Sequence, residues 1–131
     1  LDAEFEDYVN GSGEDLDGRD QAQAPGYQFY LAADYRFSQA LGLNISIEGR
    51  DDYYFSDGHA EQSPSYALVG SALRYSRENW ELSLWGRNLG DKDYFVRGFS
   101  FPNDPRDGYT ATRWTQLGAP RQFGMTAKIS F

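Results

Sequence analysis

The chain has 131 residues, enough for one ordinary domain or for part of a larger one. Its formal net charge of −8 argues against nucleic acid as a partner, and the lack of cysteine excludes disulfides and thiolate chemistry. No run of about 18 apolar residues occurs, so a transmembrane helix is excluded, although β-strands cross a bilayer without such a run.

Strict alternation of apolar and polar residues predicts six β-strands. In chain order these runs are residues 1–9, 27–37, 43–49 with an extension to Phe55, 67–75, 80–86 and 121–131. Most runs have about nine to eleven residues, the length that a tilted strand needs to cross a bilayer. A soluble antiparallel sheet with one wet face shows the same alternation, so both kinds of fold stay open at this point.

The alternation also predicts which residues share a face. We expect the odd residues of 27–37, 43–49, 67–75 and 123–131, with the even residues of 80–86, to form one convex, lipid-facing surface. The intervening residues are small, polar or singly charged, and we expect them to face water.

The predicted links alternate between short and long. Residues 38–42 and 76–79 are short turns, whereas residues 10–26, 56–65 and 90–120 are long and rich in Gly, Asp and Pro. In bacterial outer-membrane barrels the periplasmic turns are short and the extracellular loops are long. Six strands are too few to close such a barrel, whose smallest members have about eight. The predicted fold is therefore all-β, an antiparallel transmembrane β-barrel fragment of about six C-terminal strands.

An ordered set of residues near the end of the chain matches the motif N-L-x-D-x-x-Y, a long loop, G-x-P-R-x-x-G and a last strand ending in Phe. The matching residues are Asn88, Leu89, Asp91, Tyr94, Gly118, Pro120, Arg121, Gly124 and Phe131. In this order and spacing they resemble the carboxyl end of TonB-dependent outer-membrane receptors. The resemblance covers nearly the whole chain, and its last third is the specific part.

The residue types in this motif also suggest local roles, and we expect these roles to be structural. Asn88 and Asp91 are short polar side chains suited to capping the backbone where a strand ends. Gly118 is expected to take a positive φ, and Pro120 to fix φ before the last strand. Arg121 is expected to snorkel at the outer rim or to pair with loop acids.

The resemblance implies a barrel of about 22 strands plugged by an amino-terminal domain. Residues 1–131 would be the C-terminal part of the barrel domain, with the plug and the TonB-contacting segment upstream, as any export signal would be. The whole receptor would import a scarce solute across the outer membrane of a Gram-negative bacterium, with TonB-coupled energy. An iron–siderophore is the commonest cargo, followed by carbohydrate or cobalamin. The implied partners are outer-membrane lipid, the TonB complex through the plug, and the barrel-assembly machinery, which would recognise the strand ending at Phe131. No cofactor is expected.

The loop at 90–120 concentrates aromatic and cationic residues that could grip a small-molecule ligand. The candidates are Tyr94, Arg97, Phe99, Arg106, Tyr109 and Trp114, with Phe95, Phe101 and Arg113 nearby. Aromatic faces and guanidinium groups together suit an anionic chelate or a sugar ring. The alternative is a loop that packs on its own aromatic side chains.

No metal site is predicted. Asp51, Asp52, Asp57 and His59 resemble a ligand set, but the single His and the turn setting favour a solvated loop. Residues 13–20 lack the spacing of a calcium loop and are expected to form a surface loop. No Ser/His/Asp constellation, P-loop or Rossmann glycine pattern is present, so an enzyme is not expected.

Two other functions compete with the receptor. A soluble secreted β-sandwich could bind carbohydrate through the aromatic loops. A smaller outer-membrane barrel could have a structural or adhesive role. The sequence does not identify the transported solute.

Overall fold

The computed structural model describes residues 3–131 and is an all-β structure with antiparallel pairing. Within this range no α-helix occurs, and one turn of 3₁₀ helix, η1 (Pro105–Asp107), is present. The chain divides into two compact units. The sheet unit comprises Phe29–Gly49, Ala67–Lys92 and Ala119–Phe131, and the loop unit comprises Arg50–Tyr66, Asp93–Gly118 and the described part of Leu1–Gln28.

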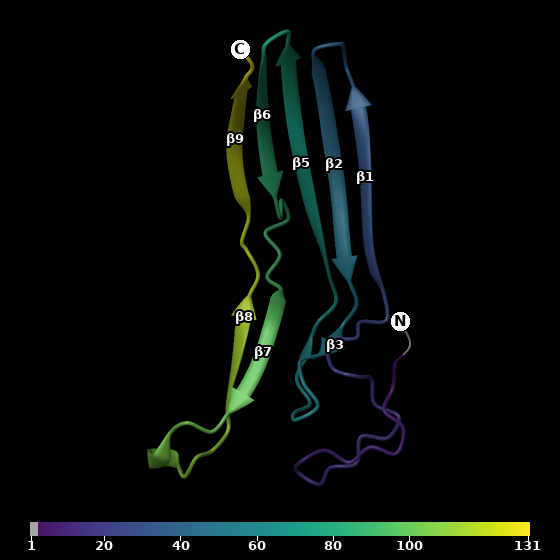
Figure 1. The fold of residues 1–131 in the computed structure, drawn as a ribbon, viewed down its shortest axis with the longest axis vertical. Coiled ribbons are helices and arrows are strands. Elements are labelled where there is room, and N and C mark those ends of the chain that lie inside the picture. Colours follow the sequence, from purple (N-terminus) through teal and green to yellow (C-terminus); the bar gives the residue numbers. More distant parts are fainter. Residues whose placement is uncertain (1–2) are drawn as a thin grey trace. The chain divides into compact units, whose positions relative to one another are not determined.

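Five long strands form one antiparallel sheet with the order β1-β2-β5-β6-β9 (Figure 1). Their bounds are Gln28–Arg36 (β1), Leu41–Arg50 (β2), Tyr66–Arg77 (β5), Trp80–Arg87 (β6) and Gln122–Ile129 (β9). These confirm the strands predicted at 27–37, 43–49, 67–75, 80–86 and 121–131. The two short turns that join β1 to β2 and β5 to β6 lie at the same end of the sheet (Figure 1).

The prediction that these alternate residues share one face is confirmed, whereas the expectation that this face is convex and meets lipid stays a prediction. Across β5, β6 and β9, Leu73 is opposite Leu84 and Leu84 is opposite Met125, so odd residues of β5 and β9 share a face with even residues of β6. On the other face the Asn44 side chain of β2 donates to Asp34 of β1 at 3.0 Å. The Ser46 hydroxyl of β2 lies against Gly70 of β5. We call the face with Leu73 and Leu84 the apolar face and its opposite the polar face.

The polar face is held by cross-strand contacts among charged and hydroxyl side chains. Glu81 of β6 lies 3.7 Å from Arg74 of β5 and 3.9 Å from Lys128 of β9, and it accepts a hydrogen bond from Ser76. The indole of Trp85 covers Gly124 and donates to Thr126 at 3.2 Å. A cleft of about 540 Å³ opens on this face near the turn between β1 and β2. Ion pairs and side-chain hydrogen bonds are therefore concentrated on the polar face of the sheet.

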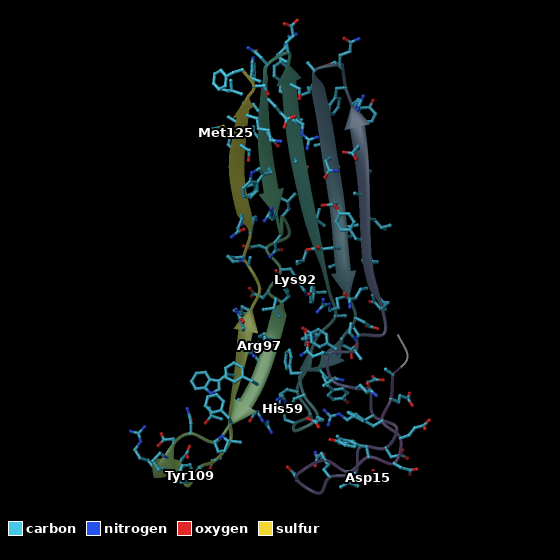
Figure 2. The ribbon with its side chains drawn as sticks, in the orientation of Figure 1. Asp15, His59, Lys92, Arg97, Tyr109 and Met125 are labelled. Carbon is cyan, nitrogen blue, oxygen red and sulfur yellow. The ribbon has the colours of Figure 1, made fainter. Side chains whose placement is uncertain are left out.

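The apolar face is uncovered. Leu31, Ile45, Leu84, Met125 and Ile129 are between 48% and 66% exposed, which is far above the values of a packed core. Figure 2 shows Met125 on β9. The sheet also ends in two edge strands, β1 and β9, and does not close into a barrel within residues 3–131.

The loop unit has its own small core, and the prediction that residues 56–65 and 90–120 are loops is wrong for residues 62–63, 95–101 and 112–117. Residues 62–63 form β4 (Gln62–Ser63), which pairs with β3 (Tyr53–Tyr54). Residues 95–101 and 112–117 form an antiparallel hairpin of β7 (Phe95–Phe101) and β8 (Thr112–Leu117). Tyr53, Phe55 and Leu16 are almost fully buried in this unit. The aromatic content of these segments supplies enough apolar area to order them.

The predicted first strand is also wrong for its described residues, 3–9; Leu1 and Asp2 lie outside the described residues. This segment makes only the isolated bridges Glu4–Asp20 and Val9–Asp15. Asp7 has a φ of +50°, and the rings of Phe5 and Tyr8 stack at 4.7 Å. Residues three apart point to opposite faces of a strand, so this stacking is incompatible with an extended segment.

The proposed extension of the third strand to Phe55 is interrupted. β2 ends at Arg50, and β3 begins at Tyr53 after the two aspartates Asp51 and Asp52. The Asp51 backbone N–H donates to the Tyr27 carbonyl at 3.1 Å, while the Asp51 carboxylate accepts from the Asp52 backbone N–H at 3.1 Å and lies against Gly26. Aspartate side chains compete with the ladder for backbone groups and so break strands.

Candidate functional site

The hairpin of β7 and β8 carries most of the predicted ligand-binding residues. Its sequences, FVRGFSF and TRWTQL, are rich in aromatic and β-branched residues, which favour strands. Phe99 is opposite Trp114 and Phe101 is opposite Thr112, while a bulge between Phe95 and Arg97 shifts the register. The hairpin therefore presents two distinct faces.

One face packs within the loop unit. Gly98 is buried beneath the ring of Phe55, where any Cβ would lie only 2.4 Å from a ring carbon. Phe55 also meets Phe95 edge to face at 6.3 Å between ring centroids. Arg113 of β8 forms an ion pair with Glu61, and the Phe95 carbonyl accepts hydrogen bonds from Tyr53 and Ser63. These contacts fix the hairpin on the segment that contains β3 and β4.

The other face is an exposed strip of aromatic and cationic side chains. We define the aromatic strip as Arg97, Phe99, Phe101 and Trp114. Phe99 and Phe101 stack at 5.6 Å with an interplanar angle of 13°, and the Arg97 guanidinium carbon lies 5.9 Å from the Phe99 ring centroid. The three rings are 41% to 52% exposed, and Figure 2 shows Arg97 on this hairpin. Such a surface can stack on a planar group and bind an anion at the same point.

Three of the six predicted ligand residues, Arg97, Phe99 and Trp114, lie together on this strip. The other three do not. The Tyr94 ring stacks on Tyr66 at 4.7 Å between centroids and fills the space above Gly118. At the hairpin tip Arg106 lies within η1 and Tyr109 follows it, as Figure 2 shows for Tyr109. The strip also includes Phe101, which lies two residues after Phe99; the period-two spacing in FVRGFSF was the signal for it.

Arg106 is held at the tip by Asp104. The guanidinium donates to both carboxylate oxygens, at 3.0 Å from Nε and 2.7 Å from Nη2, and the Arg106 backbone N–H donates at 2.9 Å. These hydrogen bonds from Arg106, the side-chain ones first, hold the pKa of Asp104 below its ordinary value. The same side-chain pair raises the pKa of Arg106. Arg106 therefore already has a carboxylate partner, whereas Arg97 has only an aromatic one among residues 3–131.

The motif residues that follow β6 form a hydrogen-bonded cluster in the sheet unit. Asn88 is 5% exposed and has a φ of +48°. Its amide nitrogen donates to the carbonyls of Lys92 and Ala119 at 2.9 and 3.1 Å, and its oxygen accepts from the Lys92 N–H at 2.9 Å. Asn88 thus caps the end of β6 and ties it to the segment that leads into β9.

Asp91 and Arg121 also belong to this hydrogen-bonded cluster. The Asp91 carboxylate accepts from the Arg121 backbone N–H at 3.1 Å and lies 3.3 Å from its guanidinium. Leu89 reaches back over Gly86, and its N–H donates to the Val69 carbonyl at 2.8 Å. Pro120 lies in the link before β9, and Phe131 follows the end of β9.

Steric requirements explain why the motif has glycine at positions 118 and 124. A Cβ on Gly124 would lie 2.2 Å from the Trp85 ring, and one on Gly118 would lie 2.0 Å from the Tyr94 ring. The predicted positive φ of Gly118 is wrong, because the positive-φ glycines among residues 3–131 are Gly13, Gly18 and Gly108. Close approach of an aromatic ring, not backbone conformation, requires glycine at position 118.

Asp51, Asp57 and His59, three of the four residues considered for a metal site, have different neighbours, and Asp52 donates its backbone N–H to Asp51. Asp57 accepts a hydrogen bond from Tyr8, which raises the pKa of that phenol, and Asp51 lies beside Gly26. The expectation that His59 lies in a solvated loop is wrong: it is 9% exposed and its Nδ1 is 2.8 Å from Glu61. Residues 13–20 are largely exposed, but Leu16 is buried. Within residues 3–131, no three His, Cys, Asp or Glu side chains gather closely enough to hold a metal ion.

No protein-family model matches this chain, and no solved structure matches it. Residues 3–131 contain no helix with the length and apolar character needed to cross a membrane.

Proposed function

We propose that this chain is part of the barrel wall of a TonB-dependent outer-membrane receptor, which imports a scarce solute. The observation that carries the proposal is the uncovered apolar face of the five-stranded sheet, backed by a polar face and bounded by two unpaired edges. In water such a face is costly, at about 25 cal/mol for each Å² left exposed. Lipid against the apolar face would remove this cost. Further strands paired with β1 and β9 would satisfy the backbone hydrogen-bonding groups of the two edges.

The dimensions of the apolar face support this placement. On β5 the apolar-face residues from Ala67 to Tyr75 span about 26 Å at roughly 3.3 Å per residue. This length is close to the apolar band of about 25 Å that outer-membrane barrels present to lipid. Tyr35, Tyr75 and Trp80 lie toward the short-turn end of the same face, where an interfacial girdle of aromatic residues is expected.

The chemistry of the aromatic strip supports an anionic or ring-bearing solute. Arg97 has aromatic but no carboxylate partners among residues 3–131. A guanidinium beside stacked rings suits an iron–siderophore first, and carbohydrate or cobalamin next. The long links that carry the strip would lie outside the cell and the short turns in the periplasm.

The proposal includes partners that act through other parts of such a receptor. Energy would come from the TonB complex through an amino-terminal plug, and the barrel-assembly machinery would insert the strands. The protein would reside in the outer membrane of a Gram-negative bacterium and would not be an enzyme.

Site-directed spin labelling tests the proposal, and the absence of cysteine makes single-cysteine variants clean in this chain. Labels are placed at Leu84 and at its neighbour Ser83, which face opposite sides of β6. In the receptor that contains this chain, folded in phosphatidylcholine vesicles, we expect the label at 84 to collide with oxygen dissolved in hydrocarbon. The label at 83 should collide with a water-soluble nickel complex. Equal nickel accessibility at both positions would overturn the membrane placement.

A second candidate is a soluble β-sandwich that binds carbohydrate, and the exposed rings of Phe99, Phe101 and Trp114 favour it. In that case another layer must cover the apolar face, and the label at 84 should be shielded from oxygen and nickel alike. The protein should then be a monodisperse, cooperatively melting species in plain buffer, and Trp114→Ala should abolish polysaccharide binding.

A further inference from the structure

Arg77 is a charged residue on an otherwise uncharged surface. The apolar-face positions within the five long strands are listed here by strand: Phe29, Leu31, Ala33 and Tyr35; Leu41, Leu43, Ile45, Ile47 and Gly49; Ala67, Val69, Ser71, Leu73, Tyr75 and Arg77; Trp80, Leu82, Leu84 and Gly86; Phe123, Met125, Ala127 and Ile129. Arg77 is the only cationic residue among these positions. It is the last residue of β5, at the short-turn end of the sheet.

The Arg77 side chain is held against aromatic residues. Its Nε donates to the Tyr75 hydroxyl at 2.8 Å, and its guanidinium carbon lies 5.3 Å from the Tyr75 ring centroid. Tyr75 in turn lies 5.4 Å from Trp80, which is directly opposite Arg77 in the β5–β6 ladder. The three side chains therefore form one cluster, which we call the rim cluster.

The guanidinium of the rim cluster has unused donors. Among residues 3–131 no carboxylate lies within ion-pair distance of Arg77, not even that of its neighbour Glu78, and its two Nη atoms make no hydrogen bond. By contrast Arg74, three residues earlier on the polar face, is near Glu81. An exposed guanidinium that is fixed at Nε but open at both Nη atoms is suited to a bidentate anion.

We propose that the rim cluster of Tyr75, Arg77 and Trp80 binds the headgroup phosphate of an anionic glycerophospholipid. The inference rests on the proposed function, because it takes the apolar face to be against lipid and the short turns to be periplasmic. Tyr and Trp then lie at the level of the headgroups, where their rings meet hydrocarbon and their polar groups meet water. The Nη atoms of Arg77 donate to two phosphate oxygens, and the acyl chains run along Leu73 and Leu82.

Quenching of Trp80 fluorescence by brominated lipids tests this site. The receptor that contains this chain is folded in phosphatidylcholine vesicles with brominated phosphatidylglycerol or, at the same mole fraction, brominated phosphatidylcholine. The Trp80 signal is the difference between each protein and its Trp80→Phe variant. We expect stronger quenching by the brominated phosphatidylglycerol. The relative affinity for that lipid should fall about fivefold in Arg77→Gln, as one cation at a membrane surface contributes about 1 kcal/mol.

Two control variants make the result specific. Arg77→Lys keeps the charge but loses the bidentate pair of donors, so its preference should lie between those of the unmodified protein and Arg77→Gln. Arg87→Gln removes a guanidinium that lies over Trp85 on the polar face, and it should leave the preference unchanged. Quenching by brominated phosphatidylcholine in every variant verifies that Trp80 still reaches lipid.

The outcomes separate this inference from the proposed function. Equal quenching by both lipids, unchanged by Arg77→Gln, would overturn the phosphate site and leave the membrane placement intact. Absence of quenching by either lipid in the unmodified protein would overturn the membrane placement itself. If Arg77→Gln fails to fold, Arg77→Met takes its place: a similar fall in the preference would support the site, and an unchanged preference would overturn it.

Discussion

At the scale of single residues, Asn88 combines two features that rarely coincide in a non-glycine residue. It is buried with a left-handed φ of +48°, and its side-chain amide makes three hydrogen bonds to the backbone. Asparagine tolerates this conformation better than most residues because its short side chain bonds locally. The residue is therefore fixed by conformation and by hydrogen bonding together.

Replacement of Asn88 should separate these two contributions. Asn88→Ala loses the amide and keeps a Cβ in a strained conformation, so we expect the free energy of unfolding to fall by about 2–4 kcal/mol. Asn88→Gly loses the same hydrogen bonds but relieves the strain, and it should be about 1 kcal/mol less damaging. Urea unfolding of the three proteins under one condition measures both steps. If the two variants are equally stable, the positive φ carries no cost here.

Gly118 offers a second test at this scale. Gly118→Ala would place a Cβ 2.0 Å from the Tyr94 ring, so that ring must move, and we expect a loss of about 1–3 kcal/mol. Gly90→Ala is the matched control, because nothing lies within 4 Å of a Cβ there. In a Tyr94→Ala background the cost of Gly118→Ala should shrink to the control level. A cost that persists without the ring would contradict the steric explanation.

At the scale of elements, the sequence predicts long regular strands well and short irregular pairing poorly. Five strands follow from alternation because neighbours such as Ile45 and Asn44 differ so strongly in polarity. The hairpin of β7 and β8 is hidden in a segment rich in Gly, Pro and Asp, although Phe99 and Phe101 keep the period of a strand. Its pairing depends on long-range contacts such as Gly98 with Phe55, which no local pattern specifies.

The candidate site was predictable only in part for the same reason. Residue types placed Arg97, Phe99 and Trp114 in a possible ligand surface, and the hairpin register brings them to one face. Nothing local distinguishes Arg106 from Arg97, yet Arg106 is bound to Asp104 and Arg97 is not. The turn that contains η1 brings the Asp104 carboxylate to Arg106, and the local sequence does not reveal this pairing.

That turn should respond to acid. Hydrogen bonds from Arg106 lower the pKa of Asp104 below its ordinary 3.8, so the ionised carboxylate is favoured in the folded tip. The resulting order is present above the ordinary pKa and is lost as pH falls through the lowered one. We expect Arg106→Gln to raise the pKa of Asp104 toward 3.8, as followed by carboxyl ¹³C NMR. Arg113→Gln, which removes the partner of Glu61, should leave it unchanged. An Asp104 titration unaffected by Arg106→Gln would contradict the pairing.

At the scale of the whole molecule, the two units differ in how they are stabilised. The loop unit buries Leu16, Tyr53 and Phe55, whereas Leu68 is the large apolar side chain that the sheet unit buries. The stability of the sheet must then come from ladder hydrogen bonds and from whatever covers its apolar face. An apolar neighbour, whether lipid or a second protein layer, and water make opposite demands on a charge placed on that face.

Arginine scanning at one pair of neighbours distinguishes these environments. Ile45 is 48% exposed on the apolar face of β2, which lies between β1 and β5, and Asn44 lies on the polar face with Asp34 at 3.0 Å. For a strand in lipid, Ile45→Arg should lower the free energy of unfolding by about 2–4 kcal/mol near the bilayer midplane. Asn44→Arg should be nearly neutral, because Asp34 is positioned to accept the new guanidinium.

The comparison is decisive because both variants add the same side chain to adjacent residues of one strand. It is made by urea unfolding in vesicles, with heat-modifiable gel mobility as the check that each variant has folded. If the apolar face is bathed in water, arginine at position 45 replaces a half-exposed isoleucine and should cost less than about 0.5–1 kcal/mol. A tolerated Ile45→Arg would therefore remove the main support for lipid at this face, whereas a large cost confined to position 45 requires an apolar neighbour there.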